Sequence, residues 1–162
     1  MNTFTVRLIS AEQARPLRQL ILRPGQPAAK SVYPMDAAPQ TFHLGAFTSD
    51  EMVGVASFYR EAPPEEEDRG WWRLRGMAVV SGMQGRGCGT ELLREGVKRI
   101  RGRGGRKLWC NARGTAVGFC RRLGFAEEGG YFEEDGHPHV VMWRQVDRDD
   151  SQLCDEADAI IA

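Results

Sequence analysis

Apolar residues recur at every second position in several stretches of the chain, a spacing that predicts β-strands. Phe4, Val6 and Leu8 lie on one side of the first such strand, which should span residues 3–9 with one buried face. The other predicted strands span residues 41–47, 52–59, 71–80, 107–112, 126–132 and 139–146. The first two of these are separated only by Thr-Ser-Asp-Glu, so we expect them to form a hairpin.

The first helix should follow the first strand. Ser10 and Gln13 form an S-x-x-Q capping box, which is typical of a helix N-terminus. Because Pro16 is poorly tolerated deep inside a helix, we expect a turn over 10–14 and the main helix over 15–22. The inward side chains of this helix should be Leu17, Leu20 and Ile21.

Two further helices carry apolar residues at helical spacing. The second follows a glycine-rich loop, and its buried stripe should contain Leu92, Leu93, Val97 and Ile100. The third is expected to begin at the cap residue Thr115 and to end at Gly124. Its buried face should contain Ala116, Phe119, Cys120 and Leu123. Two connections that contain proline, over 24–39 and 61–70, are predicted to be irregular.

The order of these elements limits the fold. One clear strand–helix–strand crossover is predicted, from residues 71–80 through the second helix to residues 107–112. A crossover of this kind joins parallel strands, whereas short turns join antiparallel ones. We therefore expect an α/β chain with a mixed sheet that contains one parallel pair. A ligand is expected where that pair lies.

Length and charge restrict the function classes. The chain has 162 residues, 41% of them hydrophobic, with 22 basic and 22 acidic side chains. These values describe one globular domain, which we assign to residues 1–146, followed by an acidic tail over 147–162. The balance of charge argues against a strongly basic nucleic-acid binder, and no apolar run has the length of a membrane span.

Targeting and metal signals are also missing from the sequence. The N-terminus lacks the basic and apolar segments of a secretory signal, so a cytoplasmic location is expected. His137 and His139 lack a third ligand, so no metal site is assigned. The cysteines show no C-x-x-C spacing and are expected to be free thiols; they are Cys88, Cys110, Cys120 and Cys154.

The most informative stretch is Met77–Thr90, Met-Ala-Val-Val-Ser-Gly-Met-Gln-Gly-Arg-Gly-Cys-Gly-Thr. Gly85, Gly87 and Gly89 alternate between a predicted strand and a helix start, where glycine lets the backbone approach a ligand. A helix N-terminus also offers its positive dipole end to an anion. The pattern predicts a phosphate-binding loop, yet it fits neither G-x-x-x-x-G-K-[ST] nor G-x-G-x-x-G.

The spacing Gln84-x-x-Gly87-x-Gly89 resembles the R/Q-x-x-G-x-G/A signature of the GCN5-related N-acetyltransferases, the GNAT superfamily. The resemblance continues in Ala78-Val79-Val80, in Asn111-Ala112, and in Phe119-Cys-Arg-Arg-Leu-Gly-Phe125, which is similar to the family's F-Y-x-x-L-G-F helix. These motifs together span about residues 70–126 and follow one another in the same order as in the family. It implies the GNAT acyl-CoA N-acyltransferase fold, a mixed sheet of six to seven strands with three to four helices, whose parallel pair splays apart at residues 71–80 and 107–112.

This resemblance implies that acetyl-CoA is the co-substrate and that the glycine loop binds its pyrophosphate without a metal. Met77 and Val79 would then bond the pantetheine arm from one strand, and Asn111 from the other. A main-chain N–H near Val79 would stabilise the oxyanion. The residues expected to contact the coenzyme are Met77, Ala78, Val79, Gln84, Gly85, Arg86, Gly87, Cys88, Gly89, Thr90, Asn111 and Phe119.

The resemblance leaves the catalytic residues open. In the family an amine attacks the thioester directly, which requires a base for the amine and benefits from an acid for the departing thiolate. The tyrosine that often serves as the acid is replaced by Cys120, which either donates the proton or only packs beside Phe119. For the base we select His139, then Glu133, with His43 third.

The acceptor is expected to be a primary amine, on a small molecule or a peptide, and the family also contains many homodimers. Two other functions stay open. The missing tyrosine motivates a coenzyme A-binding sensor on the same fold. The arginine- and glycine-rich run 99–106 motivates an RNA-binding module, but it lacks interleaved aromatic residues. A helix C-terminus explains the run better, so no nucleic-acid or membrane partner is assigned.

Overall fold

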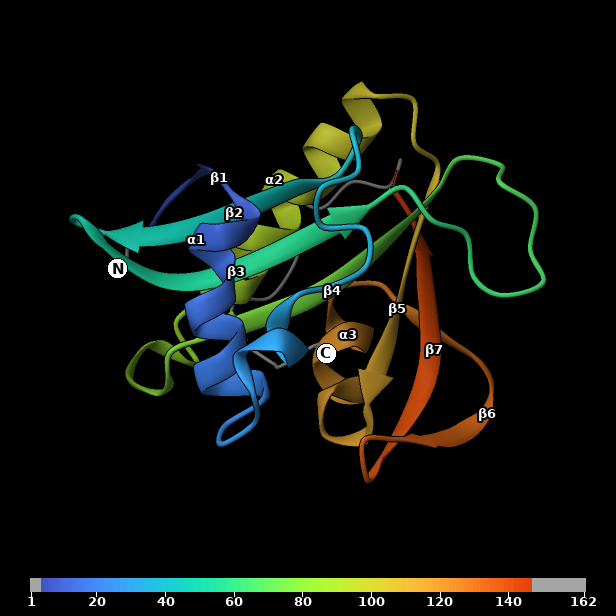
Figure 1. The fold of residues 1–162 in the computed structure, drawn as a ribbon. Coiled ribbons are helices and arrows are strands. Elements are labelled where there is room, and N and C mark those ends of the chain that lie inside the picture. Colours follow the sequence, from blue (N-terminus) through green and yellow to red (C-terminus); the bar gives the residue numbers. More distant parts are fainter. Residues whose placement is uncertain (1–3, 147–162) are drawn as a thin grey trace.

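The computed structural model describes residues 4–146, so the proposed tail over 147–162 lies outside the described residues. Within them, seven strands form one sheet and three α-helices pack on it (Figure 1). The strands are β1 (Thr5–Ile9), β2 (Phe42–Thr48), β3 (Glu51–Tyr59), β4 (Trp71–Val79), β5 (Lys107–Arg113), β6 (Ala126–Glu134) and β7 (His137–Gln145). The helices are α1 (Ala11–Leu17), α2 (Cys88–Gly102) and α3 (Val117–Arg122).

The sheet has the strand order β1-β2-β3-β4-β5-β7-β6. β4 and β5 pair in parallel, and every other neighbouring pair in this order is antiparallel. The α2 crossover from β4 to β5 accounts for the parallel pair, since a connection of that length is needed to bring the chain back. The predicted mixed sheet with one parallel pair is confirmed.

Helices cover both faces of the sheet. The predicted stripe of α2 is fully buried against one face, and it consists of Leu92, Leu93, Val97 and Ile100. The buried side chains of α3 join the same core. On the other face, Ala14 and Leu17 of α1 pack with Val55 and Ala78. Figure 1 shows α1 in front of the sheet and α2 behind it.

The first helix differs from the prediction. The capping box is confirmed, because Gln13 N–H donates to Ser10 Oγ (3.1 Å) and Ser10 N–H donates to Gln13 Oε1 (2.8 Å). The helix therefore begins at Ala11, and the predicted turn over 10–14 is wrong. Pro16 lies inside α1, where its missing N–H costs only one hydrogen bond, and a π-helical turn over Arg18–Leu22 continues the chain.

Two predicted inward residues point to solvent instead. Leu20 is 63% exposed, because the π-helical turn rotates it away from the sheet and Arg18 is buried in its place. Leu8 is 51% exposed, because β1 is an edge strand with a strand neighbour on one side only. Phe4 and Val6 are partly buried against the core, as expected.

The boundaries near α3 and β7 also differ from the prediction. Thr115 does not cap the third helix; it lies in a 3-10 turn over Gly114–Ala116, and α3 begins without a side-chain cap. Gly124 ends the helix with φ +89°, as predicted. β7 begins at His137 rather than at residue 139, because His137 already pairs with Glu134 across the turn.

Candidate active site

β4 and β5 are paired only at their first three residues. Trp71 lies beside Lys107, Trp72 beside Leu108, and Arg73 beside Trp109. Beyond this point β4 stays bonded to β3, and β5 stays bonded to β7, but β4 and β5 no longer pair. Figure 1 shows the two strands diverging. The edge of β4 over residues 74–79 therefore has no strand partner on this side.

A β-bulge lies in the unpaired part of β4. Val55 of β3 faces Ala78 and Ser57 faces Arg75, so one residue of β3 is opposed by two of β4, Gly76 and Met77. Gly76 has φ +66°, a conformation that glycine adopts without strain. The bulge changes the alternation of side chains: Met77 packs in the α2 core, whereas Ala78 packs against α1.

The glycine loop leads from the end of β4 into α2. Gly85 and Gly87 have φ values of +77° and +87°, and Gly87 is the residue that precedes the first helical position. Gln84 Nε2 donates a hydrogen bond to the Val79 carbonyl oxygen (3.0 Å), which ties the loop to the strand. Arg86 is exposed at the loop surface. The positive dipole end of α2 and the Arg86 charge thus lie beside the diverging strands.

The first residues of α2 are held against the sheet. Cys88 and Thr90 are fully buried. A Cβ added at Gly54 of β3 would lie 2.7 Å from Cys88 Sγ, so the helix start approaches β3 closely at this glycine. This contact fixes the position of the loop relative to β4. The predicted coenzyme residues from Met77 to Thr90 are therefore brought together at one end of the sheet.

The remaining predicted donor-side residues lie on β5 and α3. Asn111 is half-buried on β5, and Phe119 and Cys120 are buried on α3. The Cys120 thiol neighbours that of Cys110, and their hydrogen bond together with burial raises the pKa of the Cys110 thiol. This contact fits the interpretation of Cys120 as a packing residue. Its role as an acid stays a prediction.

His139 lies at the start of β7 and is 1% exposed. Its Nδ1 is 2.9 Å from the His137 carbonyl oxygen, and since a carbonyl can only accept, Nδ1 carries the proton. In the neutral ring Nε2 then presents a lone pair, and it has no hydrogen-bond partner among the described residues. The ring stacks on Phe132 of β6, with centroids 5.9 Å apart. An oriented imidazole with a free lone pair is suited to a general base.

Glu133 and Glu134 lie on opposite sides of β6. Phe132 pairs with His139, and Glu133 pairs with Pro138, so Glu133 points away from the His139 side of the hairpin. Glu134 points toward that side, and its Oε2 lies 3.9 Å from His139 Nε2. The structure therefore places Glu134 beside His139, whereas Glu133, the second candidate base, lies on the opposite face of the hairpin. The pairing register across the turn decides which glutamate faces His139, and the sequence does not reveal that register.

His43 belongs to a buried hydrogen-bond network. Arg18 donates to both carboxylate oxygens of Asp36 (2.8 and 3.0 Å) and to Ser57 Oγ (2.7 Å). Tyr59 donates to Asp36 Oδ1 (2.6 Å). His43 Nε2 lies 3.1 Å from the Asp36 carbonyl oxygen, so Nε2 carries the proton and Nδ1 accepts.

The charges in this network follow from burial and pairing. Burial lowers the pKa of His43, and the nearby Arg18 guanidinium lowers it further. Asp36 is buried too, but hydrogen bonds from Arg18 and Tyr59 outweigh the burial and hold its pKa well below the usual range. His43 is thus neutral with both nitrogens engaged, which removes it as a candidate base.

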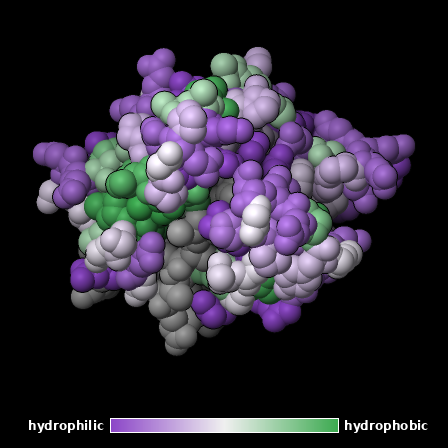
Figure 2. Space-filling model, turned by 60° about the horizontal axis from the view of Figure 1, so that its bottom comes forward, coloured by the Kyte–Doolittle hydropathy of each residue, from purple (hydrophilic) through white to green (hydrophobic). Residues whose placement is uncertain are grey.

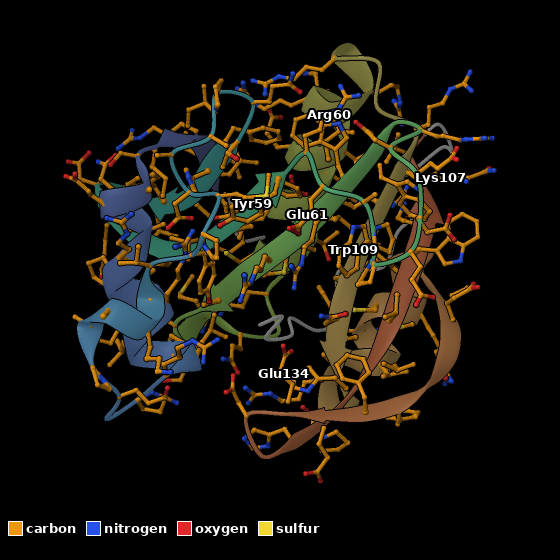
Figure 3. All side chains as sticks on the ribbon, turned by 45° about the vertical axis from the view of Figure 1, so that its right-hand side comes forward. Tyr59, Arg60, Glu61, Lys107, Trp109 and Glu134 are labelled. Atoms are coloured by element: carbon orange, nitrogen blue, oxygen red, sulfur yellow. The ribbon has the colours of Figure 1, made fainter. Side chains whose placement is uncertain are left out.

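The face of the splayed strands that lies opposite α2 carries polar and aromatic side chains. Figure 3 shows Tyr59, Glu61 and Trp109 on this face, with Glu134 near the turn between β6 and β7. Trp109 Nε1 donates to the Glu61 carbonyl oxygen (2.9 Å), which fixes the start of the 61–70 connection over β5. Tyr33, from the irregular 24–39 connection, also belongs to this face. No sequence signal marked Tyr33, because it lies between prolines outside any periodic segment.

This fold occurs in proteins of known structure. The family profile of the acetyltransferase (GNAT) domain matches residues 21–146. The chain belongs to the GNAT acetyltransferase family. This GNAT protein is accordingly an acyltransferase enzyme. A relative named uncharacterized N-acetyltransferase YitI, from Bacillus subtilis (strain 168), is 34% identical over 142 residues, which cover 87% of this chain and 95% of that protein.

Solved structures share the GNAT fold with this chain at low sequence identity. An aminoglycoside 6′-N-acetyltransferase complexed with coenzyme A has a TM-score of 0.72 at 16% identity, covering 90% of this chain and 98% of that one. An acyl-CoA N-acyltransferase from Pseudomonas aeruginosa has a TM-score of 0.69 at 18% identity, covering 88% and 99%. The predicted superfamily and fold are confirmed.

No three side chains of His, Cys, Asp or Glu within residues 4–146 come together in a group that could hold a metal ion. No helix in this range combines the length and apolar character needed to cross a membrane.

Proposed function

We propose that this GNAT enzyme transfers an acetyl group from acetyl-CoA to a primary amine by direct attack. The observation that carries the proposal is the divergence of β4 and β5 after Arg73, beside the glycine loop that opens α2. An unpaired strand edge can bond an extended ligand through main-chain groups. The edge of β4 over residues 74–79 would hold the pantetheine arm in this way, with Asn111 opposite.

The glycine loop and the start of α2 would bind the pyrophosphate. Helix N-termini favour anions through their dipole, and the exposed Arg86 adds a positive charge. The fixed position of the loop, through Gln84 and Val79, supports this role because a preorganised site loses less entropy on binding. The whole predicted set, Met77–Val79, Gln84–Thr90, Asn111 and Phe119, is proposed as the donor site.

His139 is proposed as the base that takes a proton from the attacking amine. Its Nε2 lone pair and the neighbouring Glu134 carboxylate suit this task. A main-chain N–H near Val79 would stabilise the oxyanion, an interaction worth about 3–4 kcal/mol in other acyl-transfer sites. Cys120 is retained as the proposed proton donor to the leaving thiolate, and Glu133 is replaced by Glu134 in this proposal.

The test is release of free thiol from acetyl-CoA across a panel of primary amines, with acetylated product identified by mass. The variant Gly87→Ala should raise the KM for acetyl-CoA, because alanine at φ +87° is strained by about 1–2 kcal/mol. Gly82→Ala is the matched control, since Gly82 lies in the same connection with open space around it. Equal kinetics in both variants would contradict the proposed donor site.

The alternative function is a coenzyme A-binding sensor that transfers no acetyl group. The observation that favours it is Cys120, which stands at the position of the family tyrosine and is fully buried beside Cys110. Saturable coenzyme A binding without turnover of any amine would support the sensor. Turnover that persists in Cys120→Ala would instead remove the thiol from the mechanism while retaining the enzyme.

A further inference from the structure

Three guanidinium groups surround the ring of Tyr33. The Cζ atoms of Arg75, Arg18 and Arg23 lie 4.0, 4.2 and 5.9 Å from its centroid. These residues come from β4 and from the turn after α1, so the ring joins two elements that are far apart in the sequence. Like charges so close together need compensation by anions.

The available carboxylates leave one of these charges uncompensated. Arg18 is paired with Asp36 (2.8 Å), and Arg23 with Asp135 (3.0 Å). The next arginine on β4, Arg73, is paired with Glu61 (2.9 Å). Arg75 has no carboxylate partner among the described residues. Burial and the neighbouring Arg73 charge lower the pKa of Arg75, which shows the cost of holding this cation without an anion.

The Tyr33 hydroxyl, at the end of the ring that Arg75 covers, also lacks an acceptor. Tyr33 is only 3% exposed, and its hydroxyl donates to no acceptor among the described residues, although the Arg23 guanidinium interacts with its oxygen. An O–H donor needs an acceptor, and the surrounding guanidinium groups offer none. The oxygens of one anion would offer acceptors to both Tyr33 and Arg75. Leaving such groups unpaired in the interior is unfavourable.

Tyr33 and Arg75 line the same small cavity. It has a volume of about 90 Å³, and its other walls come from Pro34, Met35, Tyr59, Glu61 and Arg73. A water molecule occupies about 30 Å³ in the liquid, so the cavity has room for an acid group but not for a whole acceptor. Glu61, the acid in its wall, is engaged by Arg73 and thus leaves Arg75 available.

We propose that this cavity binds the acid group, a carboxylate or a phosphate, of an amine acceptor. The inference rests on the proposed acetyl transfer and narrows its substrate class. Arg75 lies two residues beyond the last pair between β4 and β5, on the strand segment that would hold the thioester. An acceptor anchored there would present its amine beside the diverging strands. The enzyme then prefers acidic amines, such as amino acids or phosphorylated amines, over polyamines and other purely cationic ones.

The first test compares matched acceptors on the wild-type enzyme. Glycine is paired with glycinamide, and phosphoethanolamine with ethanolamine, so that each pair differs in its acid group. We expect kcat/KM to be about tenfold or more higher for the acidic member of at least one pair, the size of one charge-assisted contact. The pair that responds distinguishes carboxylate from phosphate. Equal values within both pairs, or preference for the uncharged members, would overturn the inference.

Variants of the cavity residues test whether this cavity causes the preference for acidic amines. Arg75→Gln should abolish the difference within the responding pair, and Arg75→Lys should retain part of it because the charge remains without the planar fork. Tyr33→Phe removes only the hydroxyl and should reduce the difference while the fold is kept. The matched control is Arg69→Gln, since Arg69 is 76% exposed and, within residues 4–146, pairs with Glu67 alone. An unchanged acid preference in both Arg75→Gln and Tyr33→Phe would overturn the inference, because these side chains would then serve only in packing.

A binding measurement separates this inference from the proposed function. N-acetylglycine and N-acetylglycinamide carry no nucleophilic amine, so their binding does not depend on acetyl transfer; phosphate monoanion is titrated beside them. Tryptophan fluorescence reports occupancy, because Trp109 lies 4.6 Å from the Arg73 guanidinium. We expect an acidic probe to bind to the wild type and not to Arg75→Gln. Acid binding without any turnover would overturn the proposed transfer alone, whereas turnover without acid binding or acid preference would overturn this inference alone.

Discussion

At the scale of single residues, one hydrogen bond decides which nitrogen of His139 can act as a base. The His137 carbonyl holds the proton on Nδ1, which leaves the Nε2 lone pair on the side of Glu134. We expect His139→Gln to lower kcat by about 10²–10⁴-fold, the range for loss of a general base. Its circular dichroism spectrum should match that of the wild type. A His139→Gln enzyme with normal kcat would remove His139 from the mechanism.

Glu133 and Glu134 form a natural pair of controls for the same hypothesis. They are adjacent acidic residues on β6, but only Glu134 points toward His139. Glu134→Gln should lower kcat, by less than the His139 change, because it removes a charge that stabilises the protonated imidazole. Glu133→Gln should leave kcat unchanged. The opposite order would restore Glu133 as the relevant carboxylate.

Asp36 should make the stability of the fold sensitive to acid. The pKa of Asp36 is lower in the folded state than in the unfolded chain, where it is about 3.9. Its contribution is therefore complete above about pH 5 and is lost as the pH falls below that value. Neutralising it leaves Arg18, which has no exposed surface, as an unpaired buried cation.

The variant Asp36→Asn tests this contribution. It should lower the free energy of unfolding at pH 7 by about 3–5 kcal/mol, the usual cost of breaking a buried ion pair. The difference from the wild type should shrink as the pH falls from 5 to 3, because the carboxyl of the unfolded wild-type chain then takes up a proton while the folded carboxyl stays ionised. Urea unfolding at several pH values measures it. A difference that is constant over this range would contradict the assigned charge state.

At the scale of the elements, the contact between α2 and β3 depends on a glycine. A Cβ added at Gly96 would lie 2.1 Å from Phe58 Cζ, so Gly96→Ala must displace a fully buried ring. We expect a loss of about 1–3 kcal/mol in the free energy of unfolding, typical of overpacking. Gly102→Ala, in the same helix with open space around it, should be neutral or slightly stabilising. Thermal unfolding of the two variants provides the comparison.

The elements themselves were largely predictable from periodicity. The α2 stripe and the β2–β3 hairpin each show a repeat that only one structure satisfies, and both are confirmed. For the first helix, Pro16 and the capping box at Ser10 predict different starts, and the structure follows the capping box. Strong local signals of this kind compete, and sequence alone does not give their relative free energies.

The glycine loop was easier to recognise in the sequence than the residues of the proposed acceptor face. The loop is one contiguous segment, so its glycines and the helix start are visible in the sequence. The proposed acceptor face instead combines Tyr33, Arg75 and Glu134 from three separate segments. The β4 bulge at Gly76 also escaped prediction, because an inserted residue changes the alternation without any marker except the glycine. Contacts between distant segments require the fold.

At the scale of the whole molecule, the splay divides the sheet into two parts that few β4–β5 pairs connect. The surface facing the bottom of Figure 1 is mostly hydrophilic, with an apolar patch to one side (Figure 2). A ligand that bonds both β4 and β5 would join the two parts and stabilise the whole fold. At a coenzyme A concentration of about 100 times Kd, the gain is about 2.7 kcal/mol.

Hydrogen exchange should show where this stabilisation acts. We expect coenzyme A to slow amide exchange in residues 74–79, since part of this strand edge has no partner on the β5 side. The β2–β3 hairpin, which is paired along its length apart from one register shift, is the internal reference and should change only through the global stabilisation. Slower exchange in the hairpin but not in residues 74–79 would contradict binding along β4.

The burial of Cys88, Cys110 and Cys120 affects how fast a thiol-reactive dye can label the protein. A thiol-reactive dye reaches these three side chains only when the surrounding core opens, because none of them is accessible in the folded protein. In excess dye, the labelling rate of these sulfurs therefore measures how often the molecule opens. The same reagent that follows coenzyme A release within seconds would, over hours, report the lifetime of the native state.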